Sequence, residues 1–203
     1  MKPVNESGAA RWTGEPPILF LMVGLPGSGK THRAKELARE RGALRLTPDA
    51  WMLSVFGQDD RHQARPDGKR WLLEGRLVAL AVDVLRLGVS VVLDFGLWSR
   101  DERSALRWLA GSVGAQCQVV YLPVERDVQW SRIQARWQDA PEGTFPMSEQ
   151  ELDDWLATFE VPSQKELSGS SLPSPPAGDE TWLDWAQRFW PSLHESLDPP
   201  LTA

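Results

Sequence analysis

The chain has 203 residues, of which 41% are hydrophobic and 25% charged, so it can bury one α/β core with a short appendage. Its net charge of −6 argues against a surface that tracks nucleic acid, because neutralising phosphates requires a dense cationic face. A single cysteine, Cys117, permits no internal disulfide and suits a reducing cytosol. Residues 1–17 lack the apolar core of a signal peptide, and the longest apolar run is too short to span a bilayer, so we expect a cytoplasmic protein.

The first part of the chain alternates apolar runs with amphipathic segments. Residues 18–23 are a continuous apolar run that ends at glycines, which predicts a strand buried on both faces of a parallel sheet. Residues 30–41 have the spacing of an amphipathic helix. A short apolar stretch at 43–46 predicts a second strand, and Pro48 suits the first position of a following helix. Asp49 therefore opens a helix directly after the second strand.

The second part of the chain continues this alternation with two more strands and four more helices. We expect strands at 89–93, closing on Asp94, and at 118–122. Helical spacing, or a capping box of serine and glutamate, predicts helices that begin near residues 69, 99, 125 and 148. The second of these is expected to end at about Leu109, since Gly111 follows. Because strands and helices alternate through connections too long for hairpins, the sequence predicts a doubly wound α/β protein with a mostly parallel sheet.

Composition divides the chain into four parts. Serine, proline and glycine dominate residues 168–179, which is typical of a linker. Beyond it, four aromatic side chains share one helical stripe, so we expect the tail to dock on the body of the protein. The expected parts are a flexible N-terminus at 1–16, a main domain at 17–167, the linker at 168–179 and a tryptophan-rich helical tail at 180–203.

The most specific motif lies between the first strand and the first helix. Residues 24–31, Gly-Leu-Pro-Gly-Ser-Gly-Lys-Thr, match the pattern G-x-x-x-x-G-K-[ST]. Glycines let successive N–H groups curl around a phosphate, and the new helix presents its positive end to the same anion. Lys30 can reach the β- and γ-phosphates, and the Thr31 hydroxyl can bind Mg²⁺. The motif therefore predicts a P-loop that binds ATP and Mg²⁺ through Gly24, Leu25, Pro26, Gly27, Ser28, Gly29, Lys30, Thr31 and His32.

On these residues the chain resembles the P-loop kinases that include polynucleotide 5′-kinase, chloramphenicol phosphotransferase and zeta toxin, and especially short bacterial ATP-binding proteins of the AAA family. The resemblance covers roughly residues 18–166 and rests on four stretches. These are 24–31, 46–57, 91–103, and 119–137 continuing into 145–166. The resemblance implies a three-layer α/β/α P-loop NTPase fold of the kinase type, with a helical lid. It does not identify the molecule that accepts the phosphoryl group.

Asp49 is the candidate base. In the kinases that the chain resembles, an aspartate just after the second strand accepts the proton of the acceptor hydroxyl, and Asp49 matches that position. Strand ends of a parallel sheet converge beside the P-loop, where an in-line nucleophile must lie. Alternatively, Asp49 only complements the dipole of its own helix. Met52 stands where polynucleotide kinase carries an arginine, which weakens the case for phosphorylation of nucleic-acid 5′-hydroxyls.

Charged residues after the third strand are candidates for the metal and the acceptor. Asp94 closes that strand, where P-loop kinases usually carry a carboxylate that holds Mg²⁺ through water or contacts the acceptor. Alternatively, it caps the following loop. Arg100 and Arg103 lie just beyond and could grip an anionic or hydroxyl-rich acceptor, or they could be solvated surface charges.

Arg132 and Arg136 share one helix face through their i, i+4 spacing. This face is adjacent to the predicted core face of Trp130, Ile133 and Trp137. The two arginines resemble the lid arginines of P-loop kinases, which stabilise charge on the transferring phosphoryl oxygens. Alternatively, they pair with surface carboxylates. Residues 138–146 are the predicted lid segment.

We therefore expect an ATP- and Mg²⁺-dependent kinase that phosphorylates a hydroxyl of a small molecule such as an antibiotic, a nucleoside or a sugar nucleotide. Its catalytic residues would be Lys30, Asp49, Arg132 and Arg136. Two alternatives stay open: a 5′-hydroxyl polynucleotide kinase or toxin-like sugar-nucleotide kinase, and an ATP-binding or ATP-hydrolysing switch that acts through a protein partner. Asp49 beside the P-loop favours transfer, since a hydrolase would need a residue that orients water.

Overall fold

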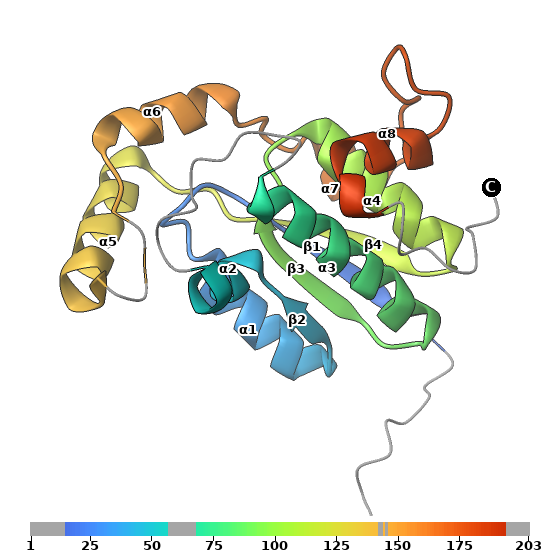
Figure 1. Ribbon diagram of the computed structural model, residues 1–203, viewed down its shortest axis with the longest axis horizontal. Helices are drawn as coiled ribbons and strands as arrows, with labels where there is room; N and C mark the ends of the chain where they lie inside the picture. Colours follow the sequence, from blue (N-terminus) through green and yellow to red (C-terminus); the bar gives the residue numbers. More distant parts are fainter. Residues whose placement is uncertain (1–14, 57–67, 142–143, 145, 194–203) are drawn as a thin grey trace, which may run out of the picture.

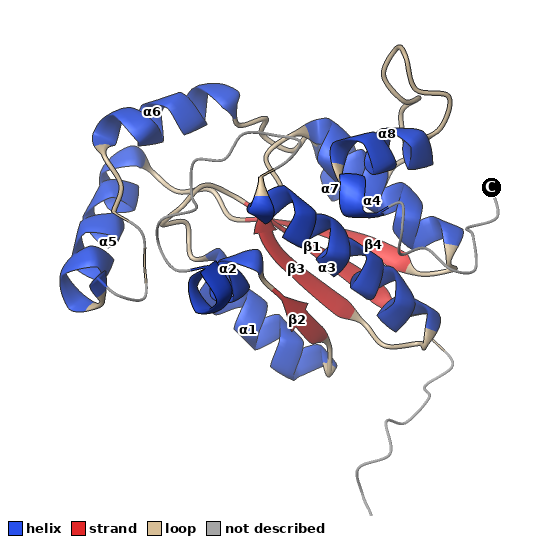
Figure 2. Cartoon of the chain, in the orientation of Figure 1, coloured by secondary structure: helices blue, strands red, loops and turns tan. Residues whose placement is uncertain are grey.

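A four-stranded sheet forms the centre of the computed structural model, which describes residues 15–56, 68–141, 144 and 146–193. Neighbouring strands pair in parallel in the order β2-β3-β1-β4. The strands are β1 (Ile18–Val23), β2 (Leu44–Leu46), β3 (Val91–Gly96) and β4 (Gln116–Tyr121). Figure 2 shows helices on both faces of this sheet, which confirms the predicted α/β class with a mostly parallel sheet.

Helices follow the strands in the predicted alternation. They are α1 (Lys30–Arg41), α2 (Pro48–Phe56), α3 (Lys69–Arg86), α4 (Arg100–Ser112), α5 (Arg126–Asp139), α6 (Glu149–Thr158), α7 (Gln164–Leu167), α8 (Trp182–Phe189) and the 3₁₀ helix η2 (Pro191–Leu193). Figure 1 shows α3, α4 and α8 together, whereas α5 and α6 lie at the other end of the molecule. No helix in the described residues is both long enough and apolar enough to cross a membrane.

Alternate residues of β1 enter two different cores. Leu19, Leu21 and Val23 belong to the larger core, which β1 shares with α3, α4 and α8. Phe20 and Met22 belong to a smaller core against α1. All five side chains are buried. The continuous apolar run therefore reflects a strand covered on both faces, as the sequence predicts.

Two elements extend beyond their predicted ends. Strand β3 continues to Gly96, because Gly96 still pairs with Val23 of β1, after a shift in register between Leu21 and Val23. Asp94 consequently lies inside the strand and not at its end. Helix α4 runs through Gly111 to Ser112, so the glycine does not terminate it.

The predicted core face of α5 is wrong in part. Ile133 is buried, but Trp130 and Trp137 are only half-buried, and Gln129 is buried in their place. The reason is the position of α5, which Figure 1 shows at the edge of the molecule, away from the main core. A buried polar side chain on this face instead serves a contact with the P-loop, described below.

The C-terminal tail packs on the body of the protein. Trp182, Trp185 and Trp190 are buried and belong to the larger core. The rings of Trp185 and Trp190 meet edge to face, with centroids 6.0 Å apart. Gly75 of α3 lies where η2 approaches, and a Cβ there would overlap the side chain of Ser192. The tail is therefore part of the packed core along its described length.

Candidate active site

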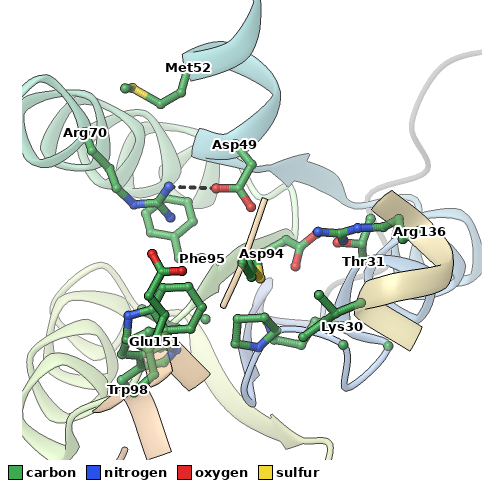
Figure 3. Close-up of a pocket in the computed structure, with 18 of the residues that line it drawn as sticks. Lys30, Thr31, Asp49, Met52, Arg70, Asp94, Phe95, Trp98, Arg136 and Glu151 are labelled. Atoms are coloured by element: carbon green, nitrogen blue, oxygen red, sulfur yellow. Dashed lines mark hydrogen bonds and ion pairs between the residues drawn. The ribbon is translucent and has the colours of Figure 1, made fainter. Parts of the chain in front are cut away.

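A cavity of about 750 Å³ opens where β1 and β3 end, which is where ligands bind in open α/β sheets. The P-loop, α2, α3, the end of β3 with the turn after it, α4, α5, and α6 with the residues just before it all contribute to its walls. Figure 3 shows Lys30, Thr31 and Arg136 on one side of the cavity, with Phe95, Trp98 and Glu151 on the other. The cavity thus brings together residues from seven separate segments of the chain.

The P-loop has the geometry of an anion cradle. Gly27 and Gly29 have φ angles of 79° and 95°, in the left-handed region that favours glycine. A Cβ on Gly27 would lie 3.0 Å from the backbone oxygen of Gln129, so a larger residue would separate the loop from α5. Helix α1 begins at Lys30, and the N–H groups of its first turn have no partner within the helix. Its positive end therefore points at the cavity, ready for a phosphate.

Lys30 is a half-buried cation on the wall of this cavity. Its Nζ donates to the carbonyl oxygen of Leu25 at 2.8 Å, across the loop. Burial lowers the pKa of Lys30 from 10.5 to about 8, although the carboxylates of Asp94 and Asp49 act to raise it. The guanidinium groups of Arg136 and Arg70 depress the pKa further. Loss of hydration on burial therefore outweighs the nearby carboxylates, and a bound triphosphate would give the ammonium a closer counter-charge.

ATP affinity is expected to fall as pH rises through about 8, the pKa of Lys30 in the free protein. Below that pH the ammonium is present in both the free and the bound protein; above it, binding must first take up a proton. The expected loss is about tenfold per pH unit, measured by calorimetric titration between about pH 7 and about pH 10. Stability without nucleotide should move the opposite way and rise between about 8 and 10.5, because the unfolded chain then binds more protons.

Lys35 gives the matched control for this pH dependence, since it is an exposed lysine on the same helix. The Lys35→Met variant should keep the pH profile, whereas Lys30→Met should bind ATP weakly at every pH. A flat affinity across this range in the wild-type protein would contradict a Lys30 that titrates near pH 8.

Asp49 lies in the first turn of α2, on the cavity wall. Its Oδ1 accepts a hydrogen bond from Nη1 of Arg70 at 2.7 Å (Figure 3). Nε of Arg70 in turn lies 3.0 Å from Oε1 of Glu74. The side chain of Asp49 is 58% exposed, so the carboxylate can meet an acceptor that enters the cavity. The sequence analysis did not identify Arg70. The i, i+4 spacing of Arg70 and Glu74 was the one local pattern that indicated their ion pair.

Asp94 is buried and paired with a residue of the neighbouring strand. Its Oδ2 accepts from Nη2 of Arg45 at 2.7 Å and from Nε of the same side chain at 3.2 Å. The guanidinium of Arg45 therefore compensates the charge of Asp94, and the carboxylate serves an ion pair between strands. The structure still places Asp94 and Thr31 on the wall of the same cavity.

The donor set around Thr31 fits Mg²⁺ in a nucleotide complex. Hydroxyl and carboxylate oxygens are the ligands that Mg²⁺ prefers, and one or two of them are enough when phosphates and water complete the shell. Among the described residues, no three potential metal ligands gather into a cluster. The site therefore suits a metal held largely by the nucleotide and not by the protein alone.

Helix α5 is hydrogen-bonded to the P-loop. Nε2 of Gln129 donates to the carbonyl oxygen of Pro26 at 2.9 Å, and Nη1 of Arg132 donates to that of Gly27 at 3.2 Å. Arg132 and Arg136 both line the cavity, as their shared face predicts. Gln129, which sequence reasoning missed, explains the buried polar position on α5. Within the predicted lid segment, residues 142, 143 and 145 lie outside the described part of the chain.

The predicted acceptor arginines lie elsewhere. Arg103 has no exposed surface; its Nε donates to Oε1 of Glu166 at 2.7 Å, and its Nη1 to the carbonyls of Leu97 and Trp98. Arg100 is exposed, and neither arginine lines the cavity. The expectation that they grip the acceptor is therefore corrected: Arg103 is buried in the fold, and Arg100 lies on the surface outside the cavity.

His32 belongs to the exposed edge of the P-loop. Its side chain is 84% exposed, and its Nε2 lies 3.1 Å from Oε1 of Glu36 on the same helix. His32 also contributes to the cavity wall. Its imidazole thus lies on the surface of α1, beside the phosphate cradle.

A glycine-rich loop that opens a helix, a half-buried lysine at its end and a parallel sheet of this order define a P-loop nucleotide-binding protein of kinase-like fold. The chain belongs to the AAA domain family, whose sequence pattern matches residues 19–162. A search of curated proteins found no match.

Solved structures share this fold at low sequence identity. A chain of the Pnkp1/Rnl/Hen1 RNA repair complex is 18% identical, with a TM-score of 0.59 over 81% of this chain, which spans only 50% of that one. A sugar kinase from Janibacter sp. HTCC2649 is 22% identical, with a TM-score of 0.53 over 93% of this chain and 99% of its own. Kti12 from Chaetomium thermophilum, in complex with ADP-AlF3, is 16% identical, with a TM-score of 0.54 over 91% of this chain and 100% of its own.

Proposed function

We propose that this chain is an ATP- and Mg²⁺-dependent kinase that transfers the γ-phosphoryl group to a hydroxyl of a small molecule. The observation that carries the proposal is that a P-loop lysine and an accessible carboxylate, Lys30 and Asp49, line one cavity. A phosphate on the loop and an acceptor beside Asp49 would then share a space closed off by α5 and α6. Phosphoryl transfer requires this in-line placement of nucleophile and phosphate more than it requires covalent chemistry.

Each charged group around the cavity has a role in this proposal. Lys30 binds the β- and γ-phosphates, and Arg132 and Arg136 stabilise the negative charge on the transferring oxygens. Thr31, and Asp94 through the carboxylate oxygen that does not bond Arg45, would hold Mg²⁺ with the nucleotide, and the bound metal would neutralise charge on the phosphate oxygens.

Asp49 accepts the proton of the acceptor hydroxyl as the oxygen attacks the γ-phosphorus. Arg70 supports this role, because its hydrogen bond to Oδ1 orients the carboxylate. Oδ2 then carries the lone pair that receives the proton. The product would be ADP and a phosphate monoester of the acceptor.

A nucleotide-dependent switch is the second candidate. The hydrogen bonds from Gln129 and Arg132 to P-loop carbonyls favour it, because a phosphate on the loop would compete for Arg132 and shift α5. A 5′-hydroxyl polynucleotide kinase gains less support, since the cavity wall carries the buried apolar Met52 on the side of Asp49. The switch would release the γ-phosphoryl group as free phosphate, whereas the polynucleotide kinase would transfer it to a 5′-hydroxyl of nucleic acid.

The fate of the γ-phosphoryl group tests the proposal. The protein is incubated with γ-labelled ATP, Mg²⁺ and a metabolite extract, with the Lys30→Ala variant as the inactive control. We expect label in a small phosphate monoester that needs both the extract and Lys30. Label in free phosphate alone, at a rate that the extract does not change, would favour the switch and contradict the kinase.

A further inference from the structure

The cavity half opposite the phosphate cradle is aromatic and apolar. Phe95 comes from the end of β3, Trp98 from the turn after it, Trp71 from α3 and Trp155 from α6. Figure 3 shows Phe95 and Trp98 across the cavity from Lys30, on the side where an acceptor would lie. We call the pair Trp98 and Trp155 the tryptophan wall; their ring centroids are 5.6 Å apart and their planes are inclined by 52°.

A strained turn presents Trp98 to the cavity. Leu97 has a φ angle of 47°, in the left-handed region that a branched side chain rarely adopts, and it follows Gly96 at 104°. A Cβ on Gly96 would lie 3.0 Å from Nε1 of Trp98, so glycine at that position lets the indole lie against the backbone. Strain of this kind persists only where the surroundings hold it in place.

Buried Arg103 supplies that support. Its Nη1 donates to the carbonyl oxygens of Leu97 at 3.1 Å and Trp98 at 3.2 Å, and Glu166 anchors the guanidinium from α7. The N–H of Glu160 also donates to the carbonyl oxygen of Trp98 at 3.0 Å. Three donations therefore fix the strained turn, two of them from one buried side chain.

Charge at this end of the cavity does not suit a phosphate on the acceptor. Among the residues that the structure describes, Arg70 is the one cation here, and it bonds to Asp49 and Glu74. Glu102 and Glu151 also contribute to the lining. An acceptor that carries a phosphate would place its charge beside these carboxylates, which costs free energy.

We propose that the acceptor is an uncharged alcohol with a flat unsaturated ring, and that this ring stacks on Trp98 of the tryptophan wall. Trp98 would thus determine specificity, and Arg103 would position it through the Leu97 and Trp98 carbonyls. Stacking on an indole face favours flat π-systems without reading their hydrogen bonds. This inference rests on the proposed kinase function and names its acceptor class.

Two matched probe pairs test the inference on the full chain saturated with Mg²⁺ and a non-hydrolysable ATP analogue. The first pair is 4-nitrophenyl and methyl β-D-glucopyranoside, which differ in the ring. The second is uridine and uridine 3′-monophosphate, which differ in charge. We expect the aryl glucoside and uridine to bind about tenfold more tightly than their partners, by calorimetric titration.

Substitutions then test whether the turn that carries Trp98 causes the preference for the ring compound. Trp98→Ala should abolish the ring preference, Trp98→Phe should keep it within about threefold, and Trp51→Ala, an exposed tryptophan outside the cavity, should change nothing. Arg103→Lys keeps a cation beside Glu166 but cannot bridge both carbonyls. It should weaken the ring preference while leaving the thermal shift caused by the ATP analogue intact.

Any of four results would overturn the inference. These are equal affinities within each pair, tighter binding of the phosphorylated probe, no binding by either ring compound, and an unchanged ring preference in Trp98→Ala. In all these cases a retained thermal shift with the ATP analogue would leave the proposed kinase standing. A wild-type protein that shows no shift with the analogue would defeat the proposed function, and the acceptor inference with it.

Discussion

Replacing Asp49 by asparagine is expected to slow phosphoryl transfer by about 10²- to 10⁴-fold, the range for loss of a general base. Asparagine keeps the shape of the side chain and an oxygen for Arg70, but it cannot take the proton of the acceptor hydroxyl. The dissociation constant for ATP should change by less than about threefold, because a general base acts in the transition state and not in nucleotide binding. Initial rates of label transfer and calorimetric titration measure the two effects separately.

Asp83→Asn is the matched control for this substitution. Asp83 is an aspartate of α3 whose side chain is 49% exposed and pairs with Arg86, and it does not line the cavity. The control should transfer label at the wild-type rate. If Asp49→Asn also did so, Asp49 would only complement the dipole of α2, and the base would have to be sought elsewhere.

Glu166→Ala is expected to lower the free energy of unfolding by about 3–5 kcal/mol, because it leaves the buried guanidinium of Arg103 without a counter-charge. It also removes the acceptor for the N–H of Ser163, which caps α7. For a domain of this size the loss corresponds to a fall in melting temperature of about 6–20 °C, measured by thermal unfolding.

Two comparison variants separate the buried charge from ordinary loss of a side chain. The double variant Arg103→Met, Glu166→Leu replaces the pair by apolar groups and should recover only part of the lost stability, because the carbonyls of Leu97 and Trp98 lose the donations of Arg103. Glu40→Ala removes a carboxylate that is 54% exposed and pairs with Arg33, and should cost no more than about 1 kcal/mol. A melting temperature of Glu166→Ala as high as that of Glu40→Ala would show that the buried pair contributes little.

Local patterns predict the elements of this fold well. The run of apolar residues in β1 and the spacing in α1 predict both elements with their observed bounds. Capping boxes such as Ser99 with Glu102 mark helix starts, because both partners lie within one turn of each other. The P-loop is predictable for the same reason, because the motif that specifies its conformation lies within eight consecutive residues.

Pairs that join distant parts of the chain could not be predicted in this way. Arg45 meets Asp94 across 49 residues, and Arg103 meets Glu166 across 63. An arginine in a predicted helix is usually a surface residue, so nothing local indicates that Arg103 is buried. Only the fold shows that Asp94 serves an ion pair between strands and that Arg103 supports the turn of Trp98.

If the P-loop holds the phosphates facing Asp49, a crystal structure with Mg²⁺, ADP and aluminium fluoride should show this arrangement. We expect the fluoride group to lie about 2.7–3.2 Å from Nζ of Lys30, with Asp49 on the far side of the aluminium. Lys30 would have left the carbonyl of Leu25 to reach it. A structure in which Lys30 still bonds to Leu25 and the nucleotide lies outside the loop would contradict the account.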